Sequence, residues 1–351
     1  MRKIVVVLIV VIIMTGIGGG TYYILNREKW VELRGIETSK KVSKMEKYDF
    51  DSLKVAWERG EYGNSEIKIL GPIKAIVDRR KADPETRKYD FVTRQIEFMS
   101  GGKRITGMIN YFNDEIKRPA VIMVRGYAEK AGYYSGSGSF RMADQLAKAG
   151  MVTVSIDFLG YAQSENESTD MMEARFEKVP AVLDLIGAVR KLEGVDPQRI
   201  GFWAHSNGGQ ITLSVLEVTG QYFPTVMWAP MTQKFPDSII STASDLEDGG
   251  RAVKAAVETL AKFHDPRRYA FENYYDWVNS PIVIIHGTKD PWCEVEWQRG
   301  VVARLTNLGK TAELRVIEGA GHNMEGRGGE TWKDVAQQTV DYFKSKLVYG
   351  N

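Results

Sequence analysis

The sequence predicts an α/β fold with a mostly parallel central sheet flanked by helices. Short apolar runs typical of buried strands alternate with amphipathic segments typical of helices, and this alternation implies strand–helix–strand units. Polar residues suited to chemistry follow several predicted strands directly, at the sheet edge where such folds bind ligands. With 351 residues and 43% hydrophobic content, the chain can form one large domain with additions or two small domains.

Composition excludes several classes of protein. The formal net charge of +2 gives no basic footprint for binding nucleic acid. Cys293 is the single cysteine, so no intrachain disulfide can form. The four histidines are too scattered in sequence to suggest a zinc site. We therefore expect neither a metal nor an organic cofactor.

Residues 1–26 predict a signal anchor or a signal peptide. Two basic residues precede an apolar run, and the uncharged stretch over residues 4–25 is long enough to cross a bilayer of about 30 Å. We expect an anchored protein that faces the extracytoplasmic side, or a secreted one if the segment is cleaved. The basic residues after the span favour a cytoplasmic domain instead. A buried core segment is a third, minor alternative.

Residues 27–60 are charged and predict a spacer, either a stalk or a solvated helical arm on the domain. The domain itself is assigned to residues 61–351. At its start, residues 66–72 and 74–77 resemble short strands. Residues 94–99 and 104–111 then alternate polar and apolar side chains around a Gly-Gly turn, which predicts a β-hairpin.

The core elements follow in order along the chain. Strands are predicted over residues 119–124, 151–157, 200–203, 225–230, 281–287 and 311–317. Helices are predicted over residues 140–150, 179–192, 210–216 and 331–347. Residues 231–280 exceed what a minimal crossover needs, and they contain a helical pattern and an aromatic group. We interpret them as a helical cap over the site, with a structural insertion elsewhere as the alternative.

Residues 199–210 predict a strand, a sharp turn and a helix, with Ser206 at the turn. This is the setting of a nucleophile elbow, in which a tight turn lifts a serine hydroxyl above the end of a parallel sheet. The usual G-x-S-x-G motif becomes Ala204-His205-Ser206-Asn207-Gly208. Alanine is the smallest residue that still carries a Cβ atom, so crowding rises only slightly.

Ser206, Asp290 and His322 follow one another in the chain order of α/β-hydrolases, each just beyond a predicted strand. A serine hydroxyl needs a base to take its proton, and histidine can take and return one near neutral pH. A buried carboxylate would hold the histidine in the correct tautomer. The backbone N–H of Asn207 is the expected oxyanion donor, with a second donor from the loop that contains Tyr127.

From about residue 94 to residue 347 the chain resembles the catalytic domain of the prolyl oligopeptidase (S9) family and its α/β-hydrolase relatives, including feruloyl-esterase-like and dienelactone-hydrolase-like enzymes. The matching segments are Ser206-Asn207-Gly208-Gly209, Trp228-Ala229-Pro230, His286-Gly287-Thr288-Lys289-Asp290-Pro291 and Gly319-Ala320-Gly321-His322. The resemblance implies that Tyr127 supplies a hydroxyl or an N–H group to the oxyanion hole.

Two segments depart from the family pattern. Arg125 stands where the family has histidine, and residues 157–164 lack the arginine and second glycine of D-x-R-G-x-G-x-S. These departures concern the oxyanion loop and substrate preference. The residues before position 94 are too few for the β-propeller of many S9 peptidases. We expect Arg125, Tyr127 and the cap to form the wall that faces the serine and selects the substrate.

The leading hypothesis is a serine hydrolase that cleaves ester or peptide-type acyl bonds of a small-molecule ester or a short peptide through an acyl-enzyme. The alternative is a membrane-tethered, non-catalytic binding protein with the same fold. Ester and peptide substrates both stay open. A substrate α-amine would need acidic partners, for which Glu165, Glu167 and Glu173 are candidates, although a solvated acidic loop is the simpler interpretation.

Overall fold

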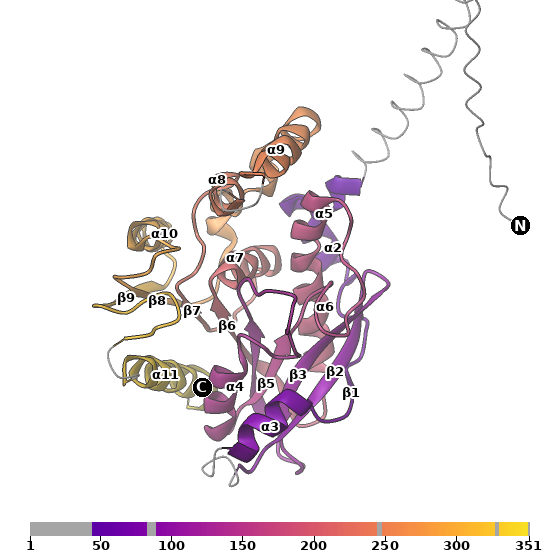
Figure 1. The fold of residues 1–351 in the computed structure, drawn as a ribbon, viewed down its shortest axis with the longest axis vertical. Helices are drawn as coiled ribbons and strands as arrows, with labels where there is room; N and C mark the ends of the chain where they lie inside the picture. Colours follow the sequence, from indigo (N-terminus) through magenta and orange to yellow (C-terminus); the bar gives the residue numbers. More distant parts are fainter. Residues whose placement is uncertain (1–43, 83–88, 244–247, 327–329, 350–351) are drawn as a thin grey trace, which may run out of the picture. The chain divides into compact units, whose positions relative to one another are not determined.

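One sheet organises the part of the chain that the computed structural model describes, namely residues 44–82, 89–243, 248–326 and 330–349 (Figure 1). It has nine strands in the order β1-β2-β3-β5-β4-β6-β7-β8-β9. Their bounds are β1 Lys68–Ile69, β2 Val92–Ser100, β3 Lys103–Tyr111, β4 Arg118–Val124, β5 Val152–Ile156, β6 Val195–His205, β7 Thr225–Trp228, β8 Ile282–Gly287 and β9 Ala312–Ile317.

The sheet is antiparallel at one side and parallel over the rest. β1, β2, β3 and β5 pair antiparallel in turn, whereas β5, β4, β6, β7, β8 and β9 pair parallel. The predicted hairpin is present as β2 and β3, joined by Gly101 and Gly102, which have φ angles of +54° and +77°. A left-handed turn of this kind favours glycine, which has no Cβ atom. The predicted α/β class with a mostly parallel sheet is thus confirmed.

Helices cover both faces of the sheet. The helices are α2 Phe50–Glu58, α3 Lys74–Ala82, α4 Phe140–Lys148, α5 Met171–Phe176, α6 Lys178–Arg190, α7 Asn207–Thr219, α8 Asp237–Ile240, α9 Arg251–Phe263, α10 Val295–Asn307, α11 Glu330–Phe343 and a π-helical turn, η8, Lys344–Val348. Short 3-10 turns are η1 Glu46–Tyr48, η3 Ser241–Ala243, η4 Pro266–Tyr269, η5 Phe271–Asn273 and η6 Tyr275–Trp277.

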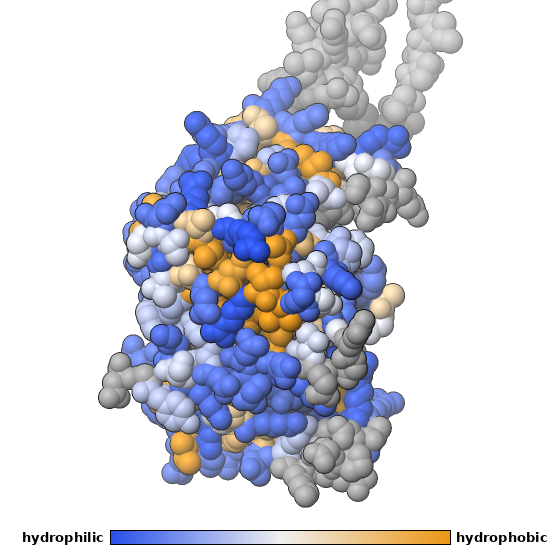
Figure 2. All heavy atoms as spheres, turned by 90° about the vertical axis from the view of Figure 1, so that its left-hand side faces the viewer, coloured by the Kyte–Doolittle hydropathy of each residue, from blue (hydrophilic) through white to orange (hydrophobic). Residues whose placement is uncertain are grey.

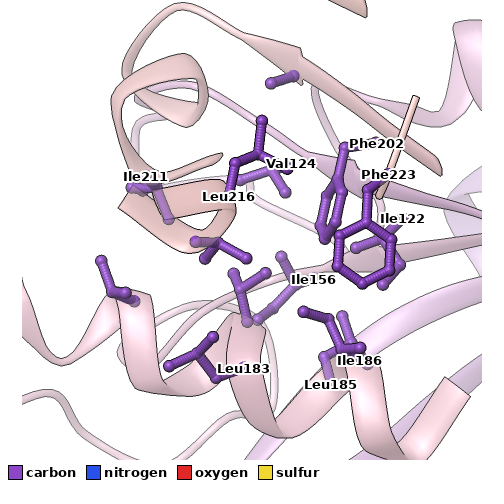
Figure 3. Close-up of a cluster of buried hydrophobic side chains, with 14 of the residues drawn as sticks. Ile122, Val124, Ile156, Leu183, Leu185, Ile186, Phe202, Ile211, Leu216 and Phe223 are labelled. Carbon is purple, nitrogen blue, oxygen red and sulfur yellow. The ribbon is translucent and has the colours of Figure 1, made fainter. Parts of the chain in front are cut away.

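Two apolar clusters lie on the two faces because side chains alternate along each strand. In β4, Ile122 belongs to the cluster under α2, α6, α7 and α10, whereas Val121 and Met123 belong to the cluster under α3, α4 and α11. Figure 3 shows the first cluster, in which Phe202 of β6 and Phe223 meet edge to face, together with side chains of α6 and α7. Burial of each such side chain stabilises the fold by about 1.5–3 kcal/mol.

The structure corrects two boundaries drawn from the sequence. Residues 74–77, predicted as strand, begin helix α3, because Ile73 and Ile76 are both buried and face the core together at helical spacing. The compact unit begins at Tyr48, not at residue 61. Residues 50–58 form α2, which packs on the domain through Phe50 and Leu53, so this part of the chain fits the alternative of a helical arm and not that of a detached stalk.

The predicted N-terminal span at residues 4–25 lies outside the described residues. Within the described part of the chain, no helix combines the length and the apolar character needed to cross a bilayer.

The insertion at residues 231–280 is largely helical, as predicted. Its longest helix, α9, buries Val253, Val257 and Leu260 and packs against α5 and α8. Figure 1 shows α8 and α9 together at the upper end of the molecule. The face that carries α10 and β9 shows an apolar area within an otherwise polar surface (Figure 2).

Candidate active site

Ser206 occupies a strained turn between β6 and α7. Its backbone has φ +53° and ψ −124°, a conformation that residues with a side chain rarely adopt. The turn is held by its neighbours, because the Ser206 N–H donates to the Trp228 carbonyl at 3.0 Å and the Ser206 carbonyl accepts from Met231 N–H at 2.8 Å. These bonds fix the serine at the carboxyl edge of the sheet, between β6 and β7.

Close backbone packing explains the glycines after the serine. A Cβ atom on Gly208 would lie 2.1 Å from the Val124 carbonyl oxygen, and one on Gly209 would lie 2.2 Å from Cβ of Pro230. The start of α7 therefore approaches β4 and the end of β7 more closely than any larger residue permits. Ala204, which replaces the usual first glycine, is fully buried within β6, where the strand accommodates its methyl group.

Asp290 and His322 meet beyond the ends of β8 and β9. His322 Nδ1 lies 2.8 Å from Asp290 Oδ2, and the two side chains are 11% and 1% exposed. Asp290 Oδ1 accepts the N–H groups of Trp292 and Cys293 at 2.8 and 3.0 Å. Burial raises the pKa of Asp290, but the hydrogen bond from His322 and those two N–H groups outweigh burial, so the pKa lies below its ordinary value. The carboxylate is therefore ionised at neutral pH.

His205 supports His322 from the side of the serine. The two imidazole centroids are 4.8 Å apart, and His205 Nε2 lies 3.0 Å from the His322 carbonyl oxygen. Burial, and then the charge of His322, lowers the pKa of His205 to about 4. His205 is therefore neutral at pH 7, so its Nε2–H donates to that carbonyl. No role was predicted for His205 from the sequence, although its position directly before Ser206 was a usable signal.

The predicted oxyanion loop lies directly against the elbow. A Cβ atom on Gly126 would be 2.7 Å from Ser206 Cβ and 3.3 Å from Ser206 Oγ, so the loop touches the serine through this glycine. Tyr127 follows, but its ring is 74% exposed and its hydroxyl donates to Glu129 at 2.9 Å. The Tyr127 hydroxyl is therefore engaged with Glu129 in this conformation, and the role of the Tyr127 backbone N–H as an oxyanion donor stays a prediction.

Arg125 does not face the serine as expected; it is 3% exposed and braces the loop from within. Its guanidinium donates to the Gly126 carbonyl at 2.7 Å and to the Tyr133 hydroxyl at 2.8 Å, and it lies 4.0 Å from the ring centroid of Tyr161. It also donates to the carbonyl of Asp157, the first residue of the second departing segment. The two departures from the family pattern are therefore joined in one buried network.

The candidate acids for a substrate amine are all engaged within the protein. Glu165 accepts the Arg104 N–H, and Glu167 pairs with Lys130 at 2.6 Å. Glu173 is 5% exposed and accepts from the Ser168 hydroxyl at 2.6 Å.

One group of side chains has the spacing of metal ligands. One ligand atom each from Asp290, Cys293 and His322 lies within 4.8 Å of the others. Burial raises the pKa of the Cys293 thiol, and the charge of Asp290 raises it further, which opposes the thiolate that a metal requires. Asp290 also already accepts hydrogen bonds on both carboxylate oxygens. The donor chemistry therefore suits a hydrogen-bonded acid–base pair better than a cation.

Comparison with known proteins relates the chain to a family of peptidases. The model of the prolyl oligopeptidase family matches residues 139–348. The uncharacterized peptidase YuxL of Bacillus subtilis (strain 168) is 24% identical over 143 residues, which cover 40% of this chain and 21% of YuxL. The chain thus spans about a fifth of the length of this relative.

Two solved structures share the fold at low identity. Acylaminoacyl peptidase from Pyrococcus horikoshii has a TM-score of 0.59 and 17% identity, over 75% of this chain and 43% of its own. Acetyl xylan esterase from Paenibacillus sp. R4 has a TM-score of 0.58 and 15% identity, over 83% of this chain and 92% of its own.

Proposed function

We propose, from the premise that the chain belongs to the prolyl oligopeptidase family, that it is a serine hydrolase of ester or peptide-type acyl bonds. Ser206 is the nucleophile, His322 the general base and Asp290 the residue that orients His322. The observation that carries the proposal is the 2.8 Å contact between His322 Nδ1 and the buried Asp290, at the sheet edge that also holds Ser206 in its strained turn.

The first half-reaction forms an acyl-enzyme. His322 Nε2 takes the proton of the Ser206 hydroxyl as Oγ bonds to the substrate carbonyl carbon, and the carbonyl oxygen becomes an oxyanion. The tetrahedral intermediate collapses, and the leaving alcohol or amine takes the proton from His322. Asp290 keeps Nδ1 protonated throughout and stabilises the imidazolium without itself taking a proton.

Water completes the cycle. His322 removes a proton from a water molecule as its oxygen attacks the acyl carbon, and the second tetrahedral intermediate releases the carboxylic acid and returns the proton to Ser206 Oγ. The backbone N–H groups of Asn207 and Tyr127 donate to the oxyanion in both intermediates. Asn207 begins helix α7, so its N–H has no partner within the helix.

A fluorophosphonate probe tests the proposal on the full-length chain. The wild-type protein is expected to be labelled on Ser206 within minutes, and Ser206→Ala is expected to lose the label. Ser345→Ala, which removes a serine from η8, is the matched control and should be labelled like wild type. If the wild type were not labelled, or if Ser206→Ala were labelled equally, the proposal would be wrong. The alternative of a non-catalytic binding protein would then be favoured.

Of the two substrate classes, esters are better supported than peptides. Glu165, Glu167 and Glu173 all have partners within the protein, so none offers a free carboxylate for a substrate α-amine. We therefore expect p-nitrophenyl acyl esters to be cleaved with a higher kcat/KM than aminoacyl p-nitroanilides that carry a free amine. The reverse order would assign the protein to peptide substrates.

The location of the enzyme rests on the sequence alone. We propose that residues 4–25 attach the domain to a membrane, with the domain on the extracytoplasmic side. Fractionation of cells that express the full chain, with an alkaline wash and external protease, tests both parts. Recovery of the whole protein in the wash, or protection from the protease in intact cells, contradicts the respective part.

A further inference from the structure

A pocket lies beside the proposed oxyanion hole, and the proposed acyl-enzyme mechanism gives it no role. Asn207 and Gln210 of helix α7 line one side of it. Aromatic residues of the insertion, among them Phe235 and Tyr269, line another side. Asn207, the residue that follows the nucleophile, is thus also part of the pocket lining.

Two cationic side chains line the pocket, Arg175 at the end of α5 and Lys178 at the start of α6. Arg175 Nε is buried and has no hydrogen-bond partner, and the guanidinium makes one long hydrogen bond, 3.3 Å, to Gln210 Oε1. Within the described part of the chain, the side-chain ammonium of Lys178 forms neither a hydrogen bond nor an ion pair. A buried donor without a partner costs about 1–3 kcal/mol.

The two cations also repel each other, and the two acids nearest to Lys178 offset this repulsion only in part. Burial, and then the charge of Arg175, lowers the pKa of Lys178 to about 8, and burial lowers the pKa of Arg175 to about 10. The nearest acids to Lys178 have other partners, since Glu167 pairs with Lys130 at 2.6 Å and Glu177 pairs with Lys103 at 3.3 Å. Both cations are still charged at pH 7, so the pocket presents two positive charges.

We propose that Arg175 and Lys178 form a carboxylate-binding subsite, and that the natural substrate carries a carboxylate on an apolar chain seated beside Asn207. The inference rests on the proposed function and names its substrate class. A guanidinium fork and an ammonium group together match a planar carboxylate, and charge-assisted hydrogen bonds of this kind are the strong ones. The aromatic wall accommodates the apolar part that links the carboxylate to the reacting carbonyl.

The carboxylate can belong to the acyl group or to the leaving group, and two pairs of compounds separate these sources. Mono-p-nitrophenyl glutarate and its methyl ester differ by a carboxylate in the acyl group. N-acetyl-alanyl-phenylalanine and its C-terminal amide differ by a carboxylate in the leaving group. Calorimetric binding to the full-length Ser206→Ala protein requires no turnover, so it reports on the subsite even if the proposed chemistry fails.

In at least one pair, the carboxylate member is expected to bind about tenfold tighter than its neutral partner. Adding Lys178→Met or Arg175→Met should bring that preference to within about twofold of unity, while Lys178→Arg should retain most of it. Lys346→Met, an exposed lysine on η8, is the matched control and should leave the preference as it is. Circular dichroism checks each fold, and Lys178→Met alone decides if Arg175→Met does not fold.

Two results would overturn the subsite. One is the absence of a preference in both pairs. The other is a preference that Lys178→Met and Arg175→Met leave unchanged. Failure of fluorophosphonate labelling with a preserved carboxylate preference would instead overturn the chemistry and keep the binding site.

Discussion

The carbonyl of His322 accepts a hydrogen bond from His205, the residue directly before the proposed nucleophile, with 3.0 Å between Nε2 and the oxygen. This contact joins the loop after β9 to the elbow after β6, two segments that lie 117 residues apart in sequence. The position of His322 relative to Ser206 is therefore set from two directions, by Asp290 through Nδ1 and by His205 through the backbone.

His205 makes stability sensitive to acid. The unfolded chain takes up a proton on this histidine near pH 6.5, whereas the folded protein resists until pH about 4. The unfolded state thus binds more protons between these values, and stability falls as the pH falls from 6.5 toward 4. Between pH 7 and 4.5, the free energy of unfolding of His205→Phe should therefore fall by about 1–3 kcal/mol less than that of the wild type, as measured by urea unfolding. If the free energies of unfolding of the wild type and His205→Phe changed with pH in parallel, the prediction would be contradicted.

Asp290→Asn tests how His322 is oriented. An amide at this position cannot stabilise the imidazolium and favours the wrong tautomer of His322, so kcat for an activated ester should fall about 10³–10⁴-fold. KM should change little, because Asp290 contacts His322 and not the substrate. Steady-state kinetics give both constants, and a fall of less than tenfold would argue against the assigned role.

Gly126→Ala tests the contact between the oxyanion loop and the elbow. The added Cβ atom would lie 2.7 Å from Ser206 Cβ and 3.1 Å from the His205 carbonyl oxygen, so the loop must move away from the serine. Loss of one oxyanion donor is expected to lower kcat by about 10²-fold. Gly300→Ala is the control, because no atom lies within 4 Å of its added Cβ. Equal kinetics for the two variants would contradict this geometry.

Glu217 is expected to make the folded protein less stable as the pH rises. It is fully buried in α7, and neither carboxylate oxygen has a hydrogen-bond partner. Burial, and then the charges of Glu272 and Asp276, raises its pKa well above 4.5. The unfolded chain releases this proton above about pH 4.5 while the folded protein keeps it, so stability falls as the pH rises.

Glu217→Gln should therefore stabilise the protein at pH 7.5 by about 1–3 kcal/mol and raise Tm by a few degrees. The gain should shrink as the pH falls toward 4.5, because the unfolded chain is then about half protonated at this carboxyl and the folded protein stays protonated. Thermal unfolding at the two pH values measures it, with the exposed Glu258→Gln as control. A destabilised Glu217→Gln at pH 7.5 would show that the carboxyl makes a favourable contact.

The carboxylate preference of the pocket should depend on pH through Lys178. Its pKa of about 8 reflects burial first, then Arg175, Glu167, Arg125 and Glu177 around it. A bound carboxylate raises this pKa, so the preference should persist to pH 8 and fall above it as the ammonium loses its proton. Binding to Ser206→Ala at about pH 6.5 and 9.5 measures the change, and Lys178→Arg, which stays charged, should show none.

The fold class was predictable because it depends on local patterns. Apolar runs and the Gly-Gly turn indicated the parallel strands and the hairpin, and these elements are present. Residues 74–77 were mispredicted, since a run of four residues with three apolar members fits a strand and a helix equally well. Only the packing of Ile73 and Ile76 on the core shows that the spacing is helical. Residues 48–60 looked like a spacer because two buried side chains, Phe50 and Leu53, are too few to mark a core helix.

For the candidate site, the sequence by itself determined which residues stand at strand ends: Ser206, Asp290 and His322. Parallel strands end at one edge, so sequence order alone implies that such residues gather there. Only the tertiary structure decided what surrounds them. Arg125 is buried and donates to the Gly126 carbonyl, and His205 donates to the His322 carbonyl. Arg175 and Lys178 line one pocket. Such contacts depend on how loops and helices far apart in sequence pack together, and no local periodicity encodes that.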